Sequence, residues 1–232
     1  STIGVVGAGQ MGNGIAHVTA LAGYRVVMMD ISQDSLTAAL SLIEKNLERQ
    51  VSSAKITAAE KAKALAQIDT TLDISKVGQA DLVIEAATED ETIKQSIFDL
   101  LLPHLQDHTI LTSNTSSISI TRLASRTDRP EKFMGFHFMN PVPVMKLVEL
   151  IRGIATDETT YAACKQVVER LGKTAASAED FPAFIVNRLL MPMINEAVYT
   201  LYEGVGNVVS IDSSMRLGAN HPMGPLELAD FI

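Results

Sequence analysis

Short apolar runs alternate with longer amphipathic segments along most of the 232-residue chain. The short runs have the length and the β-branched residues of strands, whereas the longer segments repeat apolar residues at helical spacing. Strands are predicted at residues 2–6, 24–29, 81–86, 109–112, 132–136 and 144–151. Helices are predicted at residues 11–21, 33–51, 57–69, 90–105, 119–125 and 157–171. This alternation predicts an α/β fold with a mostly parallel sheet covered by helices.

The pattern changes near residue 180. Residues 173–182 are mostly small or polar and are predicted to be a connector. A helix at 183–203 is apolar nearly all round, which is typical of a helix buried between domains or subunits. We therefore expect a first domain at residues 1–180 and the start of an all-helical C-terminal domain at residues 181–232. The final amphipathic pattern stops in mid-course and is too short to close a core, so the helical domain is expected to be truncated.

Composition narrows the class of protein. A net charge of −8 and the absence of tryptophan argue against nucleic-acid binding. Cys164 is the single cysteine, which excludes a disulfide within the chain and favours a reducing compartment. Residues 1–24 are uncharged, but glycines and polar residues interrupt the run, so it predicts neither a membrane span nor a secretory signal. We expect a cytoplasmic protein that binds no membrane and no metal ion.

A glycine motif joins the first predicted strand to the first helix. Gly7 allows a tight turn, Gly9 lets the backbone approach a pyrophosphate, and Gly12 lets the helix pack closely on the strand. The second strand ends at Asp30, whose carboxylate suits the ribose hydroxyls of an adenosine and repels a 2′-phosphate. Strand, glycine loop, helix, strand and acid predict a Rossmann-type, doubly wound domain that binds NAD. The alternative is a glycine-rich turn used only for packing.

Two further stretches carry candidate chemistry. His137 lies in an apolar run shortly before Asn140-Pro141, and Glu149 follows within the next strand. A lone histidine in such a run is most often a core residue, but Glu149 could fix its tautomer and make it a general base. Lys45 and Arg49 on the second helix, with Lys55 beyond it, form either a solvated charged face or a small basic site for a nucleotide phosphate.

Taken together, these motifs resemble those of L-3-hydroxyacyl-CoA dehydrogenases, in particular the short-chain 3-hydroxybutyryl-CoA type. The resemblance spans the whole chain in one order. It rests on Gly-Ala-Gly-Gln-Met-Gly at 7–12, Ser-Asn-Thr-Ser-Ser at 113–117, the segment from Gly135 to Glu149, Phe-Ile-Val-Asn-Arg at 184–188 and His-Pro-Met-Gly-Pro at 221–225.

The resemblance implies a role for each matching residue. His137 would take the hydroxyl proton of a 3-hydroxyacyl-CoA while hydride moves to NAD, and Glu149 would orient His137. Ser116 and Asn187 would bind the acyl group, and Asn140 would support the site. The implied cofactor residues are Gly7, Gly9, Gln10, Met11, Gly12, Asp30, Glu89, Lys94 and Asn114.

The resemblance also implies a homodimer through the C-terminal domain. At one place the sequence departs from the pattern of the family. The family commonly carries lysines where this chain has Ser52-Ser53, which leaves Arg49 and Lys55 as candidates for the phosphates of coenzyme A. Two alternatives stay open at this point. One is a hydroxyacid dehydrogenase that acts on free acids. The other is a non-enzymatic NAD-binding or structural protein, because lens λ-crystallins resemble the same family.

Overall fold

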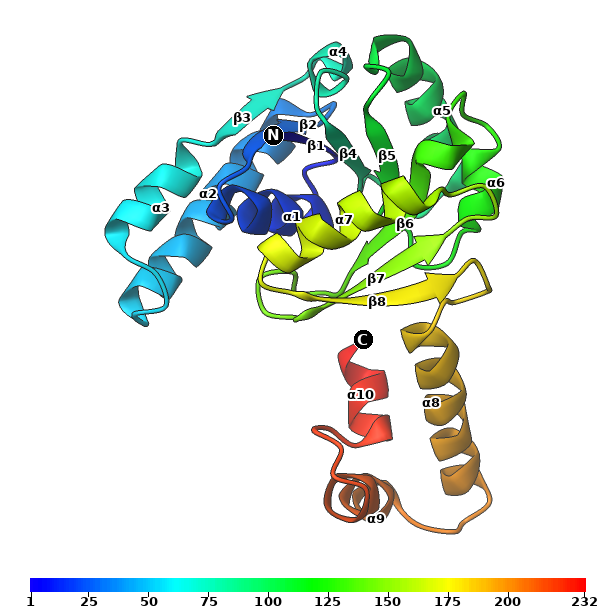
Figure 1. Ribbon diagram of the computed structural model, residues 1–232. Coiled ribbons are helices and arrows are strands. Elements are labelled where there is room, and N and C mark those ends of the chain that lie inside the picture. Colours follow the sequence, from blue (N-terminus) through cyan, green and yellow to red (C-terminus); the bar gives the residue numbers. More distant parts are fainter. The chain divides into compact units, whose positions relative to one another are not determined.

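The computed structural model describes all residues from Ser1 to Ile232 and divides into two compact units. The first unit comprises Ser1–Pro182 and the second Ala183–Ile232 (Figure 1).

The first unit is built on one eight-stranded sheet with the order β3-β2-β1-β4-β5-β6-β7-β8. The strands are β1 (Thr2–Val6), β2 (Arg25–Met29), β3 (Ile68–Thr71), β4 (Leu82–Glu85), β5 (Ile110–Ser113), β6 (Phe133–Phe138), β7 (Leu147–Arg152) and β8 (Thr174–Glu179). Every neighbouring pair is parallel except β6 and β7, which are antiparallel. The predicted α/β fold with a mostly parallel sheet is confirmed.

Helices cover both faces of this sheet (Figure 1). They are α1 (Gln10–Leu21), α2 (Gln33–Ser52), α3 (Ala58–Leu65), α4 (Ile74–Val77), α5 (Glu91–Leu101), α6 (Ile120–Ala124) and α7 (Glu158–Arg170), with short 3₁₀ turns at Leu102–His104 and Pro130–Lys132. Side-chain caps fix several helix starts: Ser32, Asp90 and Asp157 each accept a backbone N–H, and Thr57 forms a capping box with Glu60.

The core lies on the two faces of the central strands. On one face, apolar side chains of β1, β2, β4 and β6 pack with those of α1, α2 and α7. On the other face, Phe133 of β6 meets Phe98 of α5 edge to face, with 5.4 Å between ring centroids. Cys164 is buried in α7, and burial raises the pKa of its thiol. The sheet is therefore held rigidly enough to position side chains at its edge.

Three local predictions are wrong. Residues 68–69 were expected at the end of a helix but belong to β3, and residues 174–179 were expected in a connector but form β8. Both are edge strands that are only partly buried, so they lack the apolar run that marks a central strand. His137 was expected after a strand but lies inside β6, because the strand continues to Phe138.

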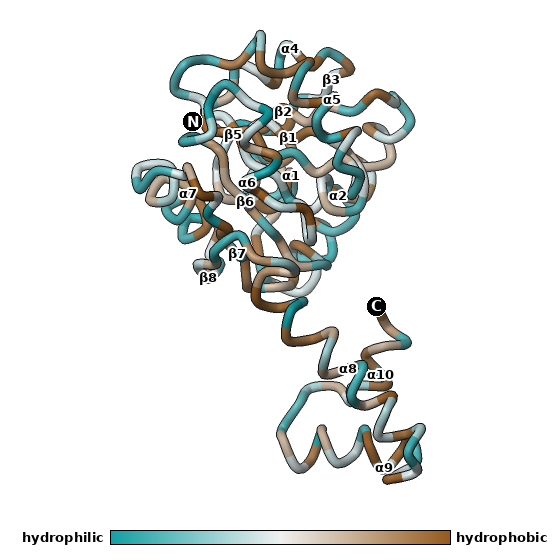
Figure 2. The backbone as a smooth tube through the Cα atoms, turned by 90° about the vertical axis from the view of Figure 1, so that its right-hand side faces the viewer, coloured by the Kyte–Doolittle hydropathy of each residue, from teal (hydrophilic) through white to brown (hydrophobic).

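The second unit is all-helical. It contains α8 (Val186–Tyr202), α9 (Val208–Ser213), a π-helical turn at Ser214–Gly218 and α10 (Pro225–Phe231). Apolar positions, brown in Figure 2, recur along this unit. Within the single chain only Ile194 and Ala197 of α8 are buried, so the expected burial of this helix between domains or subunits stays a prediction. Leu189 is 69% exposed. No helix of the protein is long and apolar enough to cross a membrane.

Candidate active site

The carboxyl ends of β1 and β4 mark the point where the strand order of the sheet reverses. The chain runs from β1 outward through β2 to β3, and then resumes on the other side of β1 with β4. Val6, the last residue of β1, is paired with Glu85, the last residue of β4. Ligands of open α/β sheets bind at such a topological switch point, outside the carboxyl ends of the strands.

The glycine loop lies at this switch point. Gly7 has a φ of +100°, and a Cβ there would lie 2.7 Å from the Ala86 carbonyl oxygen. A Cβ on Gly12 would overlap the Gly7 carbonyl oxygen, which explains why α1 can pack so closely on β1. A Cβ on Gly9 would meet nothing within 4 Å, so the loop is open on that side. The loop therefore has no room for side chains at Gly7 and Gly12, whereas the space beside Gly9 is open.

The start of α1 and the end of β2 complete a nucleotide cradle. No side chain caps α1, and its first turn holds no acidic residue. Its free N–H groups and positive dipole end suit a pyrophosphate. Asp30 is fixed by two backbone donors, Ala8 N at 2.8 Å and Ser32 N at 3.0 Å. Its carboxylate thus stands beside the loop in a defined orientation. Met11 is partly buried and packs against the core below.

His137 and Glu149 form a buried pair across two strands. The antiparallel register of β6 and β7 places the two residues directly opposite each other. His137 Nδ1 lies 2.8 Å from a carboxylate oxygen of Glu149. His137 is 6% exposed and Glu149 is fully buried. Because a carboxylate only accepts hydrogen bonds, Nδ1 of His137 is the donor. Glu149 therefore fixes the orientation of the imidazole ring.

The segment after His137 is tied to the glycine loop. The Gln10 side chain at the start of α1 donates to Asn140 Oδ1 at 3.1 Å. A Cβ on Gly14 of α1 would come within 2.8 Å of Val142, so helix and segment are in close contact. Lys173 donates to two carbonyl oxygens of the segment, one of them that of Val142, each at 2.6 Å. The sequence contained no signal for Lys173, because a connector was predicted there.

The polar loop after β5 is organised by Glu89. One of its oxygens accepts five hydrogen bonds, from the hydroxyl of Thr115 and from the backbone and hydroxyl groups of Ser116 and Ser117. Burial raises the pKa of Glu89, but the hydrogen bonds from the loop and the nearby Lys94 ammonium lower it more, so the net pKa lies below the usual value. Glu89 therefore holds Ser116 in place as a carboxylate.

Asn114 connects this loop to the histidine strand. Its Oδ1 accepts the backbone N–H of Phe138 at 2.9 Å, and Phe138 directly follows His137. Asn114 and His137 are therefore brought together at the same sheet edge, as the parallel topology predicted.

One buried acid at this edge was missed. Glu85 is fully buried, and Lys94 donates to both of its carboxylate oxygens at 2.9 and 2.7 Å. Ser113 donates to the same carboxylate at 2.7 Å. The sequence did contain a signal for Glu85, because an acidic residue stands there at the end of an otherwise apolar strand. Lys94 is thus paired with Glu85 in the interior, and its approach to a cofactor stays a prediction.

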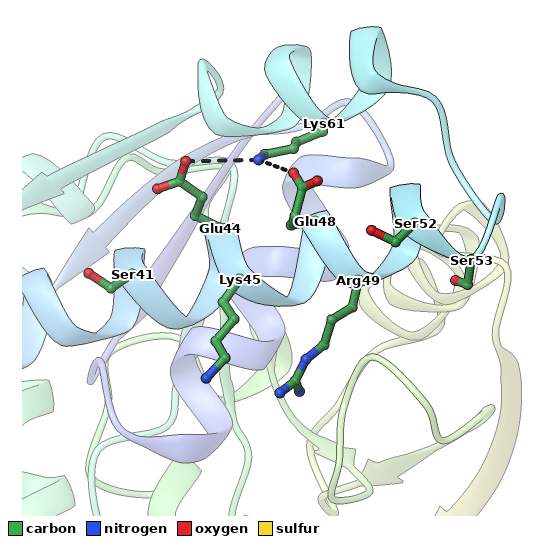
Figure 3. A pocket seen from close by; sticks show the side chains of 8 residues that line it. All are labelled: Ser41, Glu44, Lys45, Glu48, Arg49, Ser52, Ser53 and Lys61. Atoms are coloured by element: carbon green, nitrogen blue, oxygen red, sulfur yellow. Dashed lines mark hydrogen bonds and ion pairs between the residues drawn. The ribbon is translucent and has the colours of Figure 1, made fainter.

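The basic residues of α2 line a surface pocket of about 700 Å³ (Figure 3). Lys45 and Arg49 extend side by side from one side of α2, whereas Lys61 of α3 lies on the other side of α2 and pairs with Glu48 at 2.6 Å. Lys55 is not among the residues that line this pocket. The structure therefore brings Arg49 together with Lys45, and Lys61 is a cation that sequence reasoning missed.

Asn187 belongs to the second unit, where it is the second residue of α8. Its approach to His137 stays a prediction.

Comparison with known proteins decides the family. The family described as "3-hydroxyacyl-CoA dehydrogenase, NAD binding domain" matches residues 2–181, and "3-hydroxyacyl-CoA dehydrogenase, C-terminal domain" matches residues 184–232. The chain belongs to the 3-hydroxyacyl-CoA dehydrogenase family. The predicted resemblance is therefore confirmed, and so is the prediction of an NAD-dependent dehydrogenase.

Members of this family are similar to the chain over nearly its whole length. A 3-hydroxybutyryl-CoA dehydrogenase from Bradyrhizobium diazoefficiens is 61% identical over 99% of this chain and 78% of its own length. A probable 3-hydroxybutyryl-CoA dehydrogenase from Bacillus subtilis is 49% identical over 98% of this chain and 79% of its own length. The crystal structure of (S)-3-hydroxybutyryl-CoA dehydrogenase from Ralstonia eutropha has a TM-score of 0.97 at 47% identity, covering 99% of this chain and 81% of that one.

The glycine loop fits the cofactor of the 3-hydroxyacyl-CoA dehydrogenase family. Gly9 leaves open space where a pyrophosphate must approach, and the carboxylate of Asp30 is oriented by backbone donors as a ribose partner. No group of three or more histidine, cysteine or acidic residues could hold a metal ion.

Two glycine substitutions should separate cofactor binding from folding. Gly9→Ala adds a methyl group in open space, so we expect unfolding stability within about 1 kcal/mol of the parent. The same methyl group obstructs the pyrophosphate, so the Kd for NADH, measured by nucleotide fluorescence, should rise at least about tenfold. Gly12→Ala should lower both the unfolding stability and the affinity for NADH, since overpacking costs about 1–3 kcal/mol. Unchanged NADH affinity in Gly9→Ala would contradict the assignment of this loop.

Proposed function

We propose that the protein catalyses the NAD-dependent oxidation of (S)-3-hydroxyacyl-CoA, with 3-hydroxybutyryl-CoA as the preferred substrate, to 3-oxoacyl-CoA, and the reverse reduction. The observation that carries this proposal is the buried His137–Glu149 pair, which lies at the same sheet edge as the glycine loop. The names of its relatives support the thioester substrate.

In this proposal His137 is the general base. Its Nε2 would take the proton from the oxygen of the 3-hydroxyl group, and NAD held by the glycine loop and Asp30 would supply the acceptor for the hydride of C3. Glu149 stabilises the imidazolium that forms, because its charge is buried and 2.8 Å from Nδ1. In the reductive direction the imidazolium returns the proton as an acid. General base catalysis of this kind contributes about 10²–10⁴-fold in rate.

Polar side chains around His137 position the reacting groups in this proposal. Ser116 is held by Glu89 at the carboxyl edge, and we assign it to the acyl group together with Asn187 of α8. Asn140, fixed by Gln10, keeps the segment after His137 in place. The cofactor is assigned to the glycine loop, Gln10, Met11, Asp30, Glu89, Lys94 and Asn114.

The nucleotide part of coenzyme A is assigned to the basic end of α2. Arg49 and Lys45 extend together on one side of this helix, where they could bind the phosphates (Figure 3). Arg49 can bind a phosphate with two parallel hydrogen bonds. Lys55 follows α2 and is kept as a second candidate. Ser52 and Ser53 line the same pocket and add hydroxyl groups rather than charges.

The second unit is assigned to dimerisation. Large apolar side chains of α8 and of the segments after it are exposed, among them Tyr202 at 85% and Leu217 at 83%. Exposed apolar surface of this kind marks a protein–protein contact. We infer that a second copy of the chain covers part of it. Neither oxidation of free hydroxy acids nor a purely structural role is favoured by any observation.

The proposed reaction predicts turnover that depends on His137. With acetoacetyl-CoA and NADH, absorbance at 340 nm should fall with parent protein, and free acetoacetate should give no comparable rate. His137→Gln should lower kcat by at least about 10²-fold because the base is lost. The Kd for NADH should stay within about twofold, since His137 is assigned to the substrate rather than the cofactor.

Two results would contradict this function. A parent protein that binds NADH but does not turn over acetoacetyl-CoA would remove the substrate assignment. Equal loss of NADH binding and turnover in His137→Gln would make the histidine a structural residue. Tyr161→Phe is the control variant. Tyr161 lies in α7 against Arg152 of β7, outside the proposed site, so both turnover and NADH binding should stay at the parent level.

The coenzyme A assignment predicts an effect on KM that depends on the nucleotide. Arg49→Ala should raise KM for acetoacetyl-CoA roughly fivefold or more, because an exposed charge-assisted contact contributes about 1 kcal/mol. KM for acetoacetyl-pantetheine, which lacks the nucleotide, should not change. Arg25→Ala is the matched control. Arg25, at the start of β2, is exposed and pairs with Asp69 of β3. The same KM increase with both thioesters would contradict the phosphate contact.

A further inference from the structure

Three charged side chains form a cluster at the ends of β4 and α5. Lys94 of α5 is 1% exposed, and its ammonium lies 2.7 Å from Glu85 and 3.9 Å from Glu89. Glu85 is fully buried, whereas the Glu89 side chain is 42% exposed. Two carboxylates against one ammonium leave the cluster with a formal charge of −1.

The hydrogen bonds around Glu85 match a carboxylate. One of its oxygens accepts the backbone N–H of Ala87 and a Lys94 N–H, both at 2.9 Å. The other accepts Lys94 and the Ser113 hydroxyl, both at 2.7 Å. All four hydrogen bonds, from three partners, are donated to Glu85, and a buried carboxylate is retained only with such compensation. The Glu85 carboxylate is therefore fixed at the carboxyl end of β4, and the formal charge of −1 belongs to the cluster with Glu89 included.

The cluster lies on the side of the switch point away from Asp30. Asp30 ends β2, on one side of β1, whereas Glu85 ends β4, on the other side. A dinucleotide bound at this switch point places its adenosine ribose at Asp30 and its pyrophosphate at the start of α1. Its second nucleoside then extends toward β4 and β5. That second nucleoside carries the nicotinamide ring. The ring is positively charged in NAD⁺ and neutral in NADH.

We propose that Glu85, acting through the Glu85–Lys94–Glu89 cluster, is a specificity-determining residue for the oxidation state of the cofactor. A negative cluster attracts the positively charged ring of NAD⁺ but not the neutral ring of NADH. Burial of Glu85 and Lys94 reduces screening by solvent, so the attraction persists at physiological salt. The cluster thereby lowers the ratio of the Kd for NAD⁺ to the Kd for NADH. The inference rests on the proposed function only through the shared cofactor site.

The test compares cofactor affinities of a variant that keeps shape but removes charge. In Glu85→Gln the cluster becomes formally neutral, so the ratio of the Kd for NAD⁺ to the Kd for NADH should rise about tenfold. NADH binding is measured by fluorescence and NAD⁺ binding by calorimetry. The Kd for ADP-ribose, which has no nicotinamide, should stay within about twofold. Glu89→Gln removes the same charge at a more exposed position and should shift the ratio in the same direction.

Two control variants isolate the charge. Asp99→Asn removes one negative charge from an exposed position of α5, and Ser113→Ala removes a hydrogen bond to Glu85 without changing charge. Both should leave the ratio unchanged. An unchanged ratio in folded Glu85→Gln overturns the proposal, and so does an unchanged ratio in Glu89→Gln if Glu85→Gln does not fold. Parent protein that binds both cofactors without reducing acetoacetyl-CoA would refute the proposed substrate, while the ratios would still decide this inference.

Discussion

The hydrogen bond between His137 and Glu149 is the interaction on which the proposed chemistry depends. It exists because β6 and β7 are the one antiparallel pair in an otherwise parallel sheet. Antiparallel pairing places residues of two consecutive strands directly opposite each other, with side chains on the same face. A single buried carboxylate is then enough to orient the imidazole. The reversal of β7 therefore converts the edge of a nucleotide-binding sheet into a site for a base.

The rest of the site is coupled to this pair through α1 and the loop after β5. Gln10 links the start of α1 to Asn140, and Asn114 links the loop to the strand that carries His137. Glu89 fixes the serines of that loop and shares Lys94 with the buried Glu85. Hydrogen bonds thus link the segment after His137 to the start of α1, and the strand of His137 to the loop after β5, so a change in one of these parts is expected to affect the others.

Much of the first unit could be predicted from sequence because its signals are local. The glycine motif, the capping box at Thr57 and the apolar central strands each follow from short-range geometry. The edge strands could not be predicted in this way, since β8 is built from small, half-exposed residues and depends on pairing with β7. The role of Glu85 depends on Lys94 and Ser113, which only the fold brings to it. The pairing of His137 with Glu149 was proposed from the two residues alone, and the family resemblance supported it more strongly than their spacing did.

The central claim, that Glu149 acts through His137, is tested most directly by a double-mutant cycle on kcat/KM for acetoacetyl-CoA reduction. The variants are His137→Gln, Glu149→Gln and the two combined. If Glu149 serves only to orient and stabilise His137, its replacement should lower kcat/KM in the parent but cost nothing further once His137 is gone. Additive losses in the double variant would contradict the account, because they would mean that Glu149 acts independently of the histidine.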